Sequence, residues 1–447
     1  MKQDDIIELT IEALGTDGAG IAHKGEDTFF IPYTLIGERI RAKVKYVKKN
    51  IINAKLLEVL DASPMRRKPR CDVFGKCGGC AFLHMDYESQ KEFKRNQLYN
   101  CGKKIGGYDY MPLDTEGSQE YGYRNKLVLQ VGNNKGKTEM GFYAINTHKI
   151  IPINKCALHG EWAEKVIKAV SEYMRLSGET SYDESTHTGS IKHLSGRYID
   201  GQLLLIVVVN NSKGLKNVKL LESCVSKYFE KYGLFESINT NITNVIIGDS
   251  IKYLCGIKEI VSSTMNIEYS LNAGSFFQVN DEIKDKIYTT VKSLIDADTE
   301  VVIDAYSGIG ILTALLASER YDTIGIEIVK SAVEDADKIS KRNKTLRQTN
   351  LNGDVNELLQ KVFDKYNGKK ITLVLDPVRK GLDSDTVELI KNLKPMKIIY
   401  ISCNVATQAR DVGMIMDSND YEIKYAKVFD QFPQTITSES VMCLTIK

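Results

Sequence analysis

The feature that most limits the possible folds is a series of short apolar runs in the last third of the chain. These runs cover residues 300–304, 323–327, 371–375 and 397–401, and longer segments separate them. Continuous apolar runs of this length predict buried parallel strands, and the intervening segments are long enough for crossover helices. From about residue 266 the sequence therefore predicts an α/β, Rossmann-like domain with its functional side chains at the carboxyl edge of the sheet.

Cys403 directly follows the last of these runs, in Ser402-Cys403-Asn404. A strand end is a usual place for chemistry in an open α/β sheet. A lone cysteine there is also common core filling, so its position alone does not make it a nucleophile.

A glycine turn follows the first run and indicates a nucleotide-like ligand. Gly308 and Gly310 let a ligand approach the backbone, and Glu327 ends the next run, where a carboxylate can bind a ribose diol. The same layout serves NAD. Thr313 stands where a dinucleotide fold has its third glycine, which favours S-adenosylmethionine (SAM) instead, and Asp354 is placed to contact an adenine amino group.

The first 60 residues predict a small all-β module. From Arg39 to Tyr46 charged and apolar residues alternate strictly, so Arg39, Arg41, Lys43 and Lys45 share one face, with Ile40, Ala42, Val44 and Tyr46 inward. A solvated strand face is the simple interpretation. We favour an RNA-binding face, because four like charges in a row repel one another unless a bound anion neutralises them.

Three closely spaced cysteines indicate a metal centre. Cys71, Cys77 and Cys80 lie in one glycine-containing loop, and Cys156 is the best candidate for a fourth ligand. Four thiolates suit either zinc or an iron–sulfur cluster. Unligated thiols are the alternative, but nine cysteines, an odd number, argue against a disulfide framework in a reducing compartment.

Residues 61–265 predict one α+β region between these two parts. Tyr87 to Gly102 is rich in charge and predicts an exposed helix, 162–174 predicts an amphipathic helix, and 203–209 a strand. The segment 121–126 places aromatic and basic residues at a strand entry, which suits a flipped base or a phosphate but is equally ordinary for a strand entry.

Bulk properties narrow the protein class. The length of 447 residues suggests two to four domains, and no run of 18 apolar residues predicts a membrane span. No apolar segment follows Met1–Asp5, so we expect no secretory signal and a cytoplasmic location. A net charge of +2 is too small to indicate a nucleic-acid partner by itself.

Taken together, the motifs resemble the SAM-dependent RNA uracil-5 methyltransferases over the whole chain. Three signatures occur in the family's order: the cysteine loop 71–80, the Asp376-Pro377-x-Arg379-x-Gly381 loop, and Ser402-Cys403-Asn404. The resemblance implies a cysteine nucleophile at Cys403 and a general base at Glu439. It further implies SAM contacts from Gln278, Tyr306, Glu327 and Asp376, and a [4Fe-4S] cluster held by Cys71, Cys77, Cys80 and Cys156.

The N-terminal module makes the chain most similar to the rRNA-modifying branch, the 23S rRNA (uracil-5) methyltransferases. The expected fold is multidomain: a TRAM domain, an OB-like RNA-binding barrel, over 1–60; a central α+β RNA-binding domain with the iron–sulfur loop over 61–265; and a SAM methyltransferase domain over 266–447. The expected partner is RNA, with no membrane and no obligate protein partner. Two departures are Val378, where the family usually has a second proline, and Ser438, where it commonly has histidine.

Other functions remain open at this point. The same reaction on the T-loop uridine of tRNA is the nearest alternative, and a non-catalytic RNA-binding or assembly factor is a different class. A DNA cytosine methyltransferase also uses a cysteine, but its nucleophile follows the fourth strand, one strand earlier than Cys403.

Overall fold

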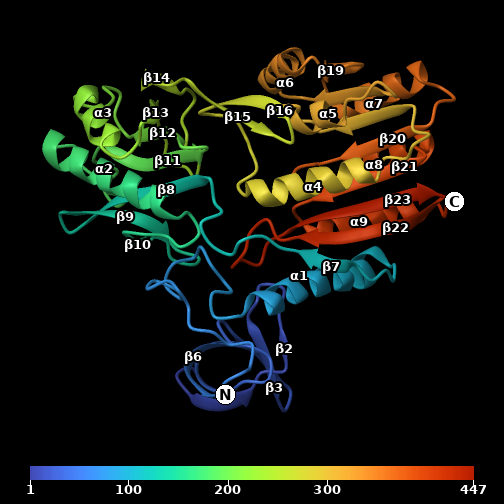
Figure 1. The fold of residues 1–447 in the computed structure, drawn as a ribbon. Coiled ribbons are helices and arrows are strands. Elements are labelled where there is room, and N and C mark those ends of the chain that lie inside the picture. The colour runs from blue at the N-terminus through green and yellow to red at the C-terminus, as the bar shows by residue number, and fades with distance from the viewer.

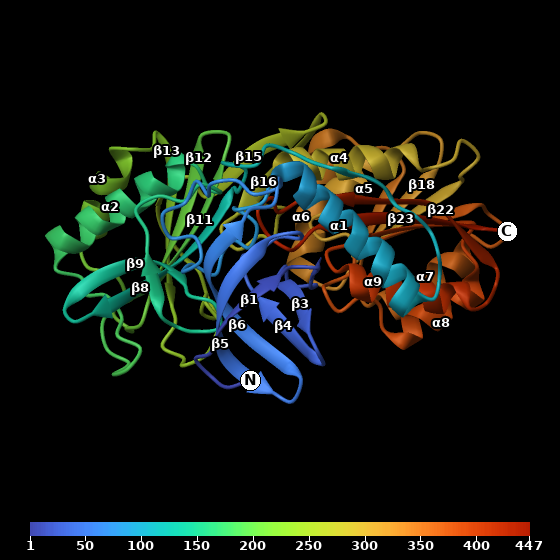
Figure 2. The same ribbon diagram turned by 90° about the horizontal axis from the view of Figure 1, so that it is seen from below.

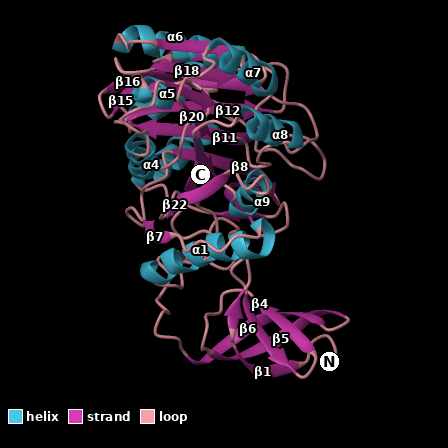
Figure 3. Ribbon diagram, turned by 90° about the vertical axis from the view of Figure 1, so that its right-hand side faces the viewer, coloured by secondary structure: helices cyan, strands magenta, loops and turns pink.

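The computed structural model describes all 447 residues, which form three large sheets and one separate hairpin (Figure 1). Seen from below, the N-terminal sheet lies under the junction between the other two (Figure 2). In the side view it stands apart beneath helix α1, joined to the rest by loops (Figure 3).

The N-terminal sheet has six strands in the order β1-β5-β6-β4-β3-β2. Its strands are β1 (Ile6–Thr10), β2 (Ala13–Leu14), β3 (Gly20–Lys24), β4 (Asp27–Ile31), β5 (Arg39–Lys48) and β6 (Ile51–Asp61). Alternating apolar residues form its core, including Ile40, Ala42 and Val44 of β5. The inward orientation predicted for Tyr46 is wrong. The β5–β6 register shifts between Val44 and Tyr46, which breaks the alternation and leaves Tyr46 57% exposed.

Basic side chains on β5 form ion pairs within the protein. Arg39 pairs with Asp61 and Glu8, Arg41 with Glu58 and Glu8, and Lys43 with Asp4. These acids come from neighbouring strands and the N-terminal segment, so they could not be read from β5 alone. Three of the four basic side chains therefore need no external anion to balance their charge.

The central sheet has seven strands in the order β10-β9-β8-β11-β12-β13-β14. They are β8 (Lys126–Asn134), β9 (Lys137–Tyr143), β10 (Ile150–Pro152), β11 (Ile191–Ile199), β12 (Gln202–Val209), β13 (Lys231–Ile238) and β14 (Lys252–Gly256). Helices α2 (Glu161–Ser177) and α3 (Val218–Ser226) cover one face. The other face of β12 packs on the hairpin β15 (Glu259–Thr264) and β16 (Ile267–Asn272) and, through it, on the C-terminal part. The predictions for 162–174 and 203–209 are confirmed by α2 and β12.

The C-terminal sheet has eight strands in the order β19-β18-β17-β20-β21-β23-β22-β7. They are β7 (Leu113–Glu116), β17 (Val301–Ala305), β18 (Asp322–Glu327), β19 (Gln348–Asn352), β20 (Ile371–Leu375), β21 (Lys397–Ser402), β22 (Tyr421–Phe429) and β23 (Glu439–Ile446). The five strands from β19 to β21 are parallel, and β23 runs antiparallel beside β21. The apolar runs predicted as buried parallel strands are all confirmed.

Helices cover both faces of this sheet. On one face α7 (Val355–Lys365), α8 (Ser384–Leu393) and α9 (Val405–Met416) pack against it. On the other lie α4 (Asp281–Ser293), α5 (Ile311–Leu316) and α6 (Lys330–Asn343). The order β17-α5-β18-α6-β19-α7-β20-α8-β21 is the doubly wound arrangement that the sequence predicts.

Helix α1 (Tyr87–Cys101) is not the exposed helix predicted from its charge. It buries Gln90, Lys94 and Leu98, and Leu98 belongs to the core of the C-terminal sheet. A π-helical turn (Gly102–Gly106) follows it, and β7 then joins that sheet beside β22. The prediction failed because the buried polar side chains of α1 have partners several hundred residues away.

None of the helices combines the length and the apolar character that crossing a membrane requires.

Candidate active site and cysteine-lined cavity

The predicted site residues gather at the carboxyl edge of the parallel strands. Ala305 pairs with both Ile326 and Leu375, so the next residues, Tyr306, Glu327 and Asp376, stand at one level at the edge of the sheet, Glu327 as the last residue of β18. Cys403 follows β21, the neighbour of β20. The edge of the sheet thus brings four of the predicted residues together.

Cys403 and Glu439 meet through the antiparallel pairing of β21 and β23. Ser402 pairs with Ser440, so one step further along the register Cys403 stands across from Glu439. Glu439 is buried, and its carboxyl group makes no hydrogen bond or ion pair within the protein. Its position is therefore set by the backbone of β23 rather than by a side-chain partner.

Burial and neighbouring acids shape the proton affinities of this site. Burial, followed by the charges of Glu439 and Asp376, raises the pKa of the Cys403 thiol to about 11, against the opposing effect of Arg379. Burial and Asp376 raise the pKa of Glu439 well above its usual range. Burial, with a contribution from Asp304, raises the pKa of Asp376 to about 7. Three acidic groups share one partly desolvated space, an environment that favours a cationic ligand.

The loop after Asp376 is fastened to helix α9. The Asp411 carboxylate accepts from the Leu382 backbone N–H at 2.8 Å and from the Tyr400 hydroxyl at 2.6 Å. Gly381 has a φ of +76°, and a Cβ there would lie 2.4 Å from Asp411 Oδ2. Asn404, beside the cysteine, caps α9 and donates to the Arg379 carbonyl at 3.2 Å. These contacts explain why the loop carries a glycine at 381 and fix it beside Cys403.

The glycine turn after β17 is built around Glu327. Its carboxylate accepts from the Gly308 N–H at 3.0 Å and from the Val329 N–H at 2.8 Å. Gly308 has a φ of +54°, and no atom lies within 4 Å of the place where a Cβ would stand. Thr313, where a dinucleotide fold has glycine, is buried and donates to Asp304 at 2.6 Å. The turn therefore presents an oriented acid beside open space.

Large apolar side chains stand exposed around this edge. Phe276 is 77%, Val378 73% and Ile328 64% exposed, each in a loop next to a predicted site residue. Exposed apolar side chains that cluster at a polar site are typical of a surface that a ligand covers. With the free space at Gly308, the residues present fit an adenosine-containing ligand such as SAM.

Gln278 and Asp354 have contacts that sequence reasoning missed. Gln278 Oε1 accepts from Gln431 Nε2 at 3.0 Å, and the Gln278 carbonyl accepts from Asn125 at 3.0 Å. Gln431 is fully buried, and its own Oε1 has no hydrogen-bond partner. Asp354 lies two residues after the end of β19 and caps helix α7 by accepting from the Asn356 N–H. No local sequence pattern indicates Gln431 or Asn125 as part of the site.

The four predicted metal-binding cysteines face one cavity. Cys71, Cys77, Cys80 and Cys156 all line a cavity of about 80 Å³. Burial raises the pKa values of Cys77, Cys80 and Cys156. The Gly79 N–H donates to Cys77 Sγ at 3.4 Å, as expected of a glycine loop around sulfur. As the side chains stand, no three histidine, cysteine or carboxylate groups in the chain are arranged to hold a metal ion.

His159 lies against this cavity and is held neutral. Burial, with help from Arg124, lowers the pKa of His159 to about 3. Its Nε2 donates to the Lys126 carbonyl at 2.9 Å, so Nδ1 is left as an acceptor 3.1 Å from Cys156 Sγ. Both His159 and Cys156 line the cavity. Sequence reasoning did not find this histidine, although its position three residues after Cys156 is a signal that could have done so.

Comparison with known proteins gives consistent matches. The sequence model of the family described as tRNA (Uracil-5-)-methyltransferase matches residues 251–447. An uncharacterized RNA methyltransferase of Halalkalibacterium halodurans is 34% identical, with 100% of this chain and 98% of that protein covered. One from Listeria monocytogenes is 35% identical, covering 99% of this chain and 98% of its own length.

A solved structure matches in fold across the whole chain. It is the Pyrococcus abyssi tRNA (uracil-54, C5)-methyltransferase in complex with S-adenosyl-L-homocysteine. The TM-score is 0.79 at 24% identity, covering 98% of this chain and 99% of that one. The arrangement of all three large sheets therefore has a known counterpart.

Proposed function

The chain belongs to the SAM-dependent RNA (uracil-5-)-methyltransferase family, and from this premise we propose that it methylates C5 of a specific uridine in 23S rRNA through a covalent adduct with Cys403. The observation that carries the proposal is the β21–β23 register, which supports a thiol and a carboxyl group facing each other beside Asp376. Uracil-5 methylation requires one nucleophile and one base at the same base edge.

Cys403 is the proposed nucleophile. C5 of uracil is too weak a nucleophile to be methylated directly. Attack of the Cys403 thiolate on C6 forms a C–S bond and moves the C5–C6 π electrons toward C5 and O4, so that C5 can accept a methyl group. Because the free thiol has a pKa of about 11, it is protonated at neutral pH and needs a cation nearby to ionise. Arg379 already opposes the rise in its pKa.

Glu439 is the proposed general base. After methyl transfer C5 carries both a hydrogen and a methyl group. Removal of that proton by Glu439 restores the C5–C6 double bond and expels Cys403. Glu439 acts as the base in its ionised form, and because burial raises its pKa, that carboxylate is a stronger proton acceptor than one in water.

Gln278, Tyr306, Glu327 and Asp376 are the residues that would hold SAM. When bound, SAM supplies an electrophilic methyl group on a positively charged sulfonium. Glu327, oriented by two backbone N–H groups, would take the ribose hydroxyls, and Asp376 contributes negative charge to the same space. The same acids that raise the pKa of Cys403 thus provide the environment for a cationic donor.

Cys71, Cys77, Cys80 and Cys156 would hold a [4Fe-4S] cluster. The shared cavity and the all-cysteine donor set support this assignment over an oxygen-ligated metal. Methylation of uracil requires no electron transfer. We therefore propose a structural role, in which the cluster shapes the loop 71–80.

The remaining regions would hold the RNA. A uridine in folded RNA must be extruded before a protein can reach C6. We propose a TRAM-type barrel over 1–60, a central RNA-binding domain over 61–265 and the methyltransferase domain over 266–447, in a cytoplasmic enzyme that acts without an obligate protein partner. Tyr121 and Arg124 stand at the entry to the central sheet. The guanidinium carbon of Arg124 lies 5.8 Å from the centre of the Phe432 ring.

A tRNA substrate is the alternative, and the fold match to the Pyrococcus abyssi protein favours it. The Pyrococcus abyssi protein, whose name concerns tRNA, covers 98% of this chain, so its N-terminal region has a counterpart here. The presence of such a module is therefore shared by at least one tRNA enzyme.

Mapping 5-methyluridine in a strain that lacks the gene tests the proposal. Loss of one or more 5-methyluridines from 23S rRNA is the expected result. Loss from tRNA alone would transfer the same chemistry to the tRNA substrate. Unchanged methylation of all RNA, together with RNA binding by the purified protein, would indicate a non-catalytic factor instead.

A further inference from the structure

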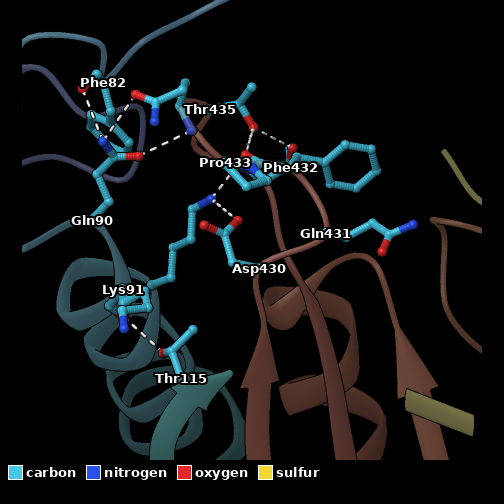
Figure 4. A network of polar contacts seen from close by, with 12 residues as sticks. Phe82, Gln90, Lys91, Thr115, Asp430, Gln431, Phe432, Pro433 and Thr435 are labelled. Atoms are coloured by element: carbon cyan, nitrogen blue, oxygen red, sulfur yellow. Dashed lines mark hydrogen bonds and ion pairs between the residues drawn. The ribbon is translucent and has the colours of Figure 1, made fainter. Parts of the chain in front are cut away.

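The segment 430–438, which joins β22 to β23, leaves the C-terminal sheet and returns to it. Its two ends are neighbours, because Phe429 at the end of β22 pairs with Glu439 at the start of β23. Between them the chain extends to the cysteine loop and helix α1. Figure 4 shows Asp430, Phe432, Pro433 and Thr435 of this segment with Phe82 and Gln90 beside them.

Gln434 makes hydrogen bonds that attach segment 430–438 to the cysteine loop and helix α1. Its carbonyl accepts from the backbone N–H groups of Ala81 at 2.9 Å and Phe82 at 3.0 Å, directly after Cys80. Its N–H donates to Gln90 Oε1 at 3.0 Å, and its side-chain Oε1 accepts from Gln90 Nε2 at 3.0 Å. Arg67 also donates to this oxygen, and the Gln434 amide donates to Glu120 at 2.9 Å. Every polar group of Gln434 is used.

The backbone of Gln434 is strained. Its φ of +72° lies in the left-handed region, which costs a non-glycine residue about 1–2 kcal/mol. Residues persist there only when their surroundings determine their conformation, and such residues gather at functional sites. Gln434 is fully buried and fixed by groups from α1, the cysteine loop and the entry to the central sheet.

Further contacts fix the rest of the segment. Lys94 Nζ donates to Asp430 and to the Phe432 carbonyl, and the Tyr123 hydroxyl donates to the Pro433 carbonyl at 3.0 Å. Ile436 packs against the cluster formed by Leu35, Phe82 and Met85. Glu439 itself has no side-chain partner, so these anchors and the β21–β23 pairing together determine where its carboxyl group lies.

On the basis of the proposed function, we propose that Gln434 is a positioning residue that fixes Glu439 for removal of the C5 proton, by tying segment 430–438 to the cysteine loop and to Gln90. The cysteine loop then contributes to the reaction through the backbone of Ala81 and Phe82. Loosening Gln434 slows the elimination step, while attack by Cys403 and methyl transfer continue.

The test compares Gln434→Gly with two other variants. Glycine tolerates the positive φ, and the partners of Gln434 keep other contacts: Gln90 still donates to the Phe82 and Met85 carbonyls, and Arg67 still pairs with Glu120. Gln434→Gly removes the side-chain contacts with Gln90, Arg67 and Glu120 and frees the backbone, but it keeps the N–H and carbonyl contacts of residue 434. Gln90→Leu removes both hydrogen bonds between Gln90 and Gln434 from the side of α1. Asn419→Gly is the control, since Asn419 also has a positive φ (59°) but is exposed in the turn before β22.

The readout is the fate of labelled SAM methyl in a single turnover with unmodified RNA from the deletion strain. In parallel steady-state assays at varied RNA concentration, we expect Gln434→Gly and Gln90→Leu to lower kcat by about one to two orders of magnitude, part of the effect of a general base, with KM for RNA unchanged. A denaturation-resistant protein–RNA adduct that carries the methyl group should accumulate in both variants. Asn419→Gly should resemble the wild type.

Three results would overturn the inference. They are wild-type turnover by Gln434→Gly, a slower rate without adduct, and a rise in KM alone. If Gln434→Gly melts well below the wild type, Gln90→Leu decides by the same adduct measurement. Absence of both adduct and methylated product with the wild-type protein would instead refute the proposed function, and so separates the two failures.

Discussion

Replacing Lys94 by methionine should strongly destabilise the C-terminal part of the protein. The Lys94 and Asp430 side chains are both 0% exposed, and their charged atoms lie 2.5 Å apart. Asp430 Oδ2 has no hydrogen-bond partner, so Lys94 supplies the compensation for this buried carboxylate. Methionine keeps the length and apolar stem of lysine and removes only the ammonium group.

The expected size follows from this geometry. Removing one partner of a buried ion pair costs about 3–5 kcal/mol, because the remaining charge is left uncompensated. This corresponds to a change of about 10²- to 4 × 10³-fold in the folding equilibrium. Lys391→Met is the matched control: Lys391 pairs with Glu388 on the surface of α8 at 2.8 Å, and such pairs contribute less than about 1 kcal/mol.

Urea denaturation followed by fluorescence measures the effect, with Asp430→Asn and the double variant completing a cycle. The double variant should recover about 1–3 kcal/mol relative to the sum of the single changes, because it leaves no unpaired charge. A single-variant cost below about 1 kcal/mol, or strict additivity, would refute this reasoning.

Three further predictions follow from the site. Gly381→Ala should cost more stability than Gly368→Ala in thermal melts. Both glycines have a positive φ, but a Cβ at residue 381 would lie 2.4 Å from Asp411 Oδ2, whereas nothing lies within 4 Å of a Cβ at residue 368, and equal costs would contradict the prediction. With a pKa of about 11, Cys403 in the SAM-free protein should be alkylated about ten times faster for each pH unit from about 7 to about 10, as followed on its peptide by mass spectrometry; a plateau near neutral pH would contradict this. Protein prepared anaerobically should be brown and contain iron and sulfide, and Cys80→Ser should lower both; colourless protein with stoichiometric zinc would show a different metal.

The sequence predicted the C-terminal sheet well because its signals are local. Four of the five parallel strands contain the apolar runs, and Tyr306, Glu327, Asp376 and Cys403 stand at the ends of these strands or directly after them. The edge of the sheet could therefore be located without the structure. Glu439 is different. Its pairing with Cys403 depends on the antiparallel register of β23, and only the resemblance to a family indicated it.

The Tyr46 error came from the register shift in β5, whereas the errors on α1 and on the basic face of β5 share another cause, which is polar partners distant in sequence. Lys94 lies 336 residues from Asp430 in sequence, and Gln90 lies 344 residues from Gln434. The sequence of α1 alone therefore predicted an exposed charged helix. In β5, Arg39 and Arg41 likewise form ion pairs with Asp61 and Glu58 of β6. Charge patterns report how a segment could be solvated, whereas long-range partners decide whether it is buried.

The most direct test of the central claim is Glu439→Gln in a single turnover with labelled SAM. If Glu439 is the base, the variant binds RNA, allows Cys403 to attack and accepts the methyl group, and then stops before elimination. Denaturing electrophoresis should show a slow-migrating protein–RNA band that carries the label, and Cys403→Ala in the same background should remove it. Normal turnover by Glu439→Gln, or a labelled band that persists without Cys403, would contradict the account.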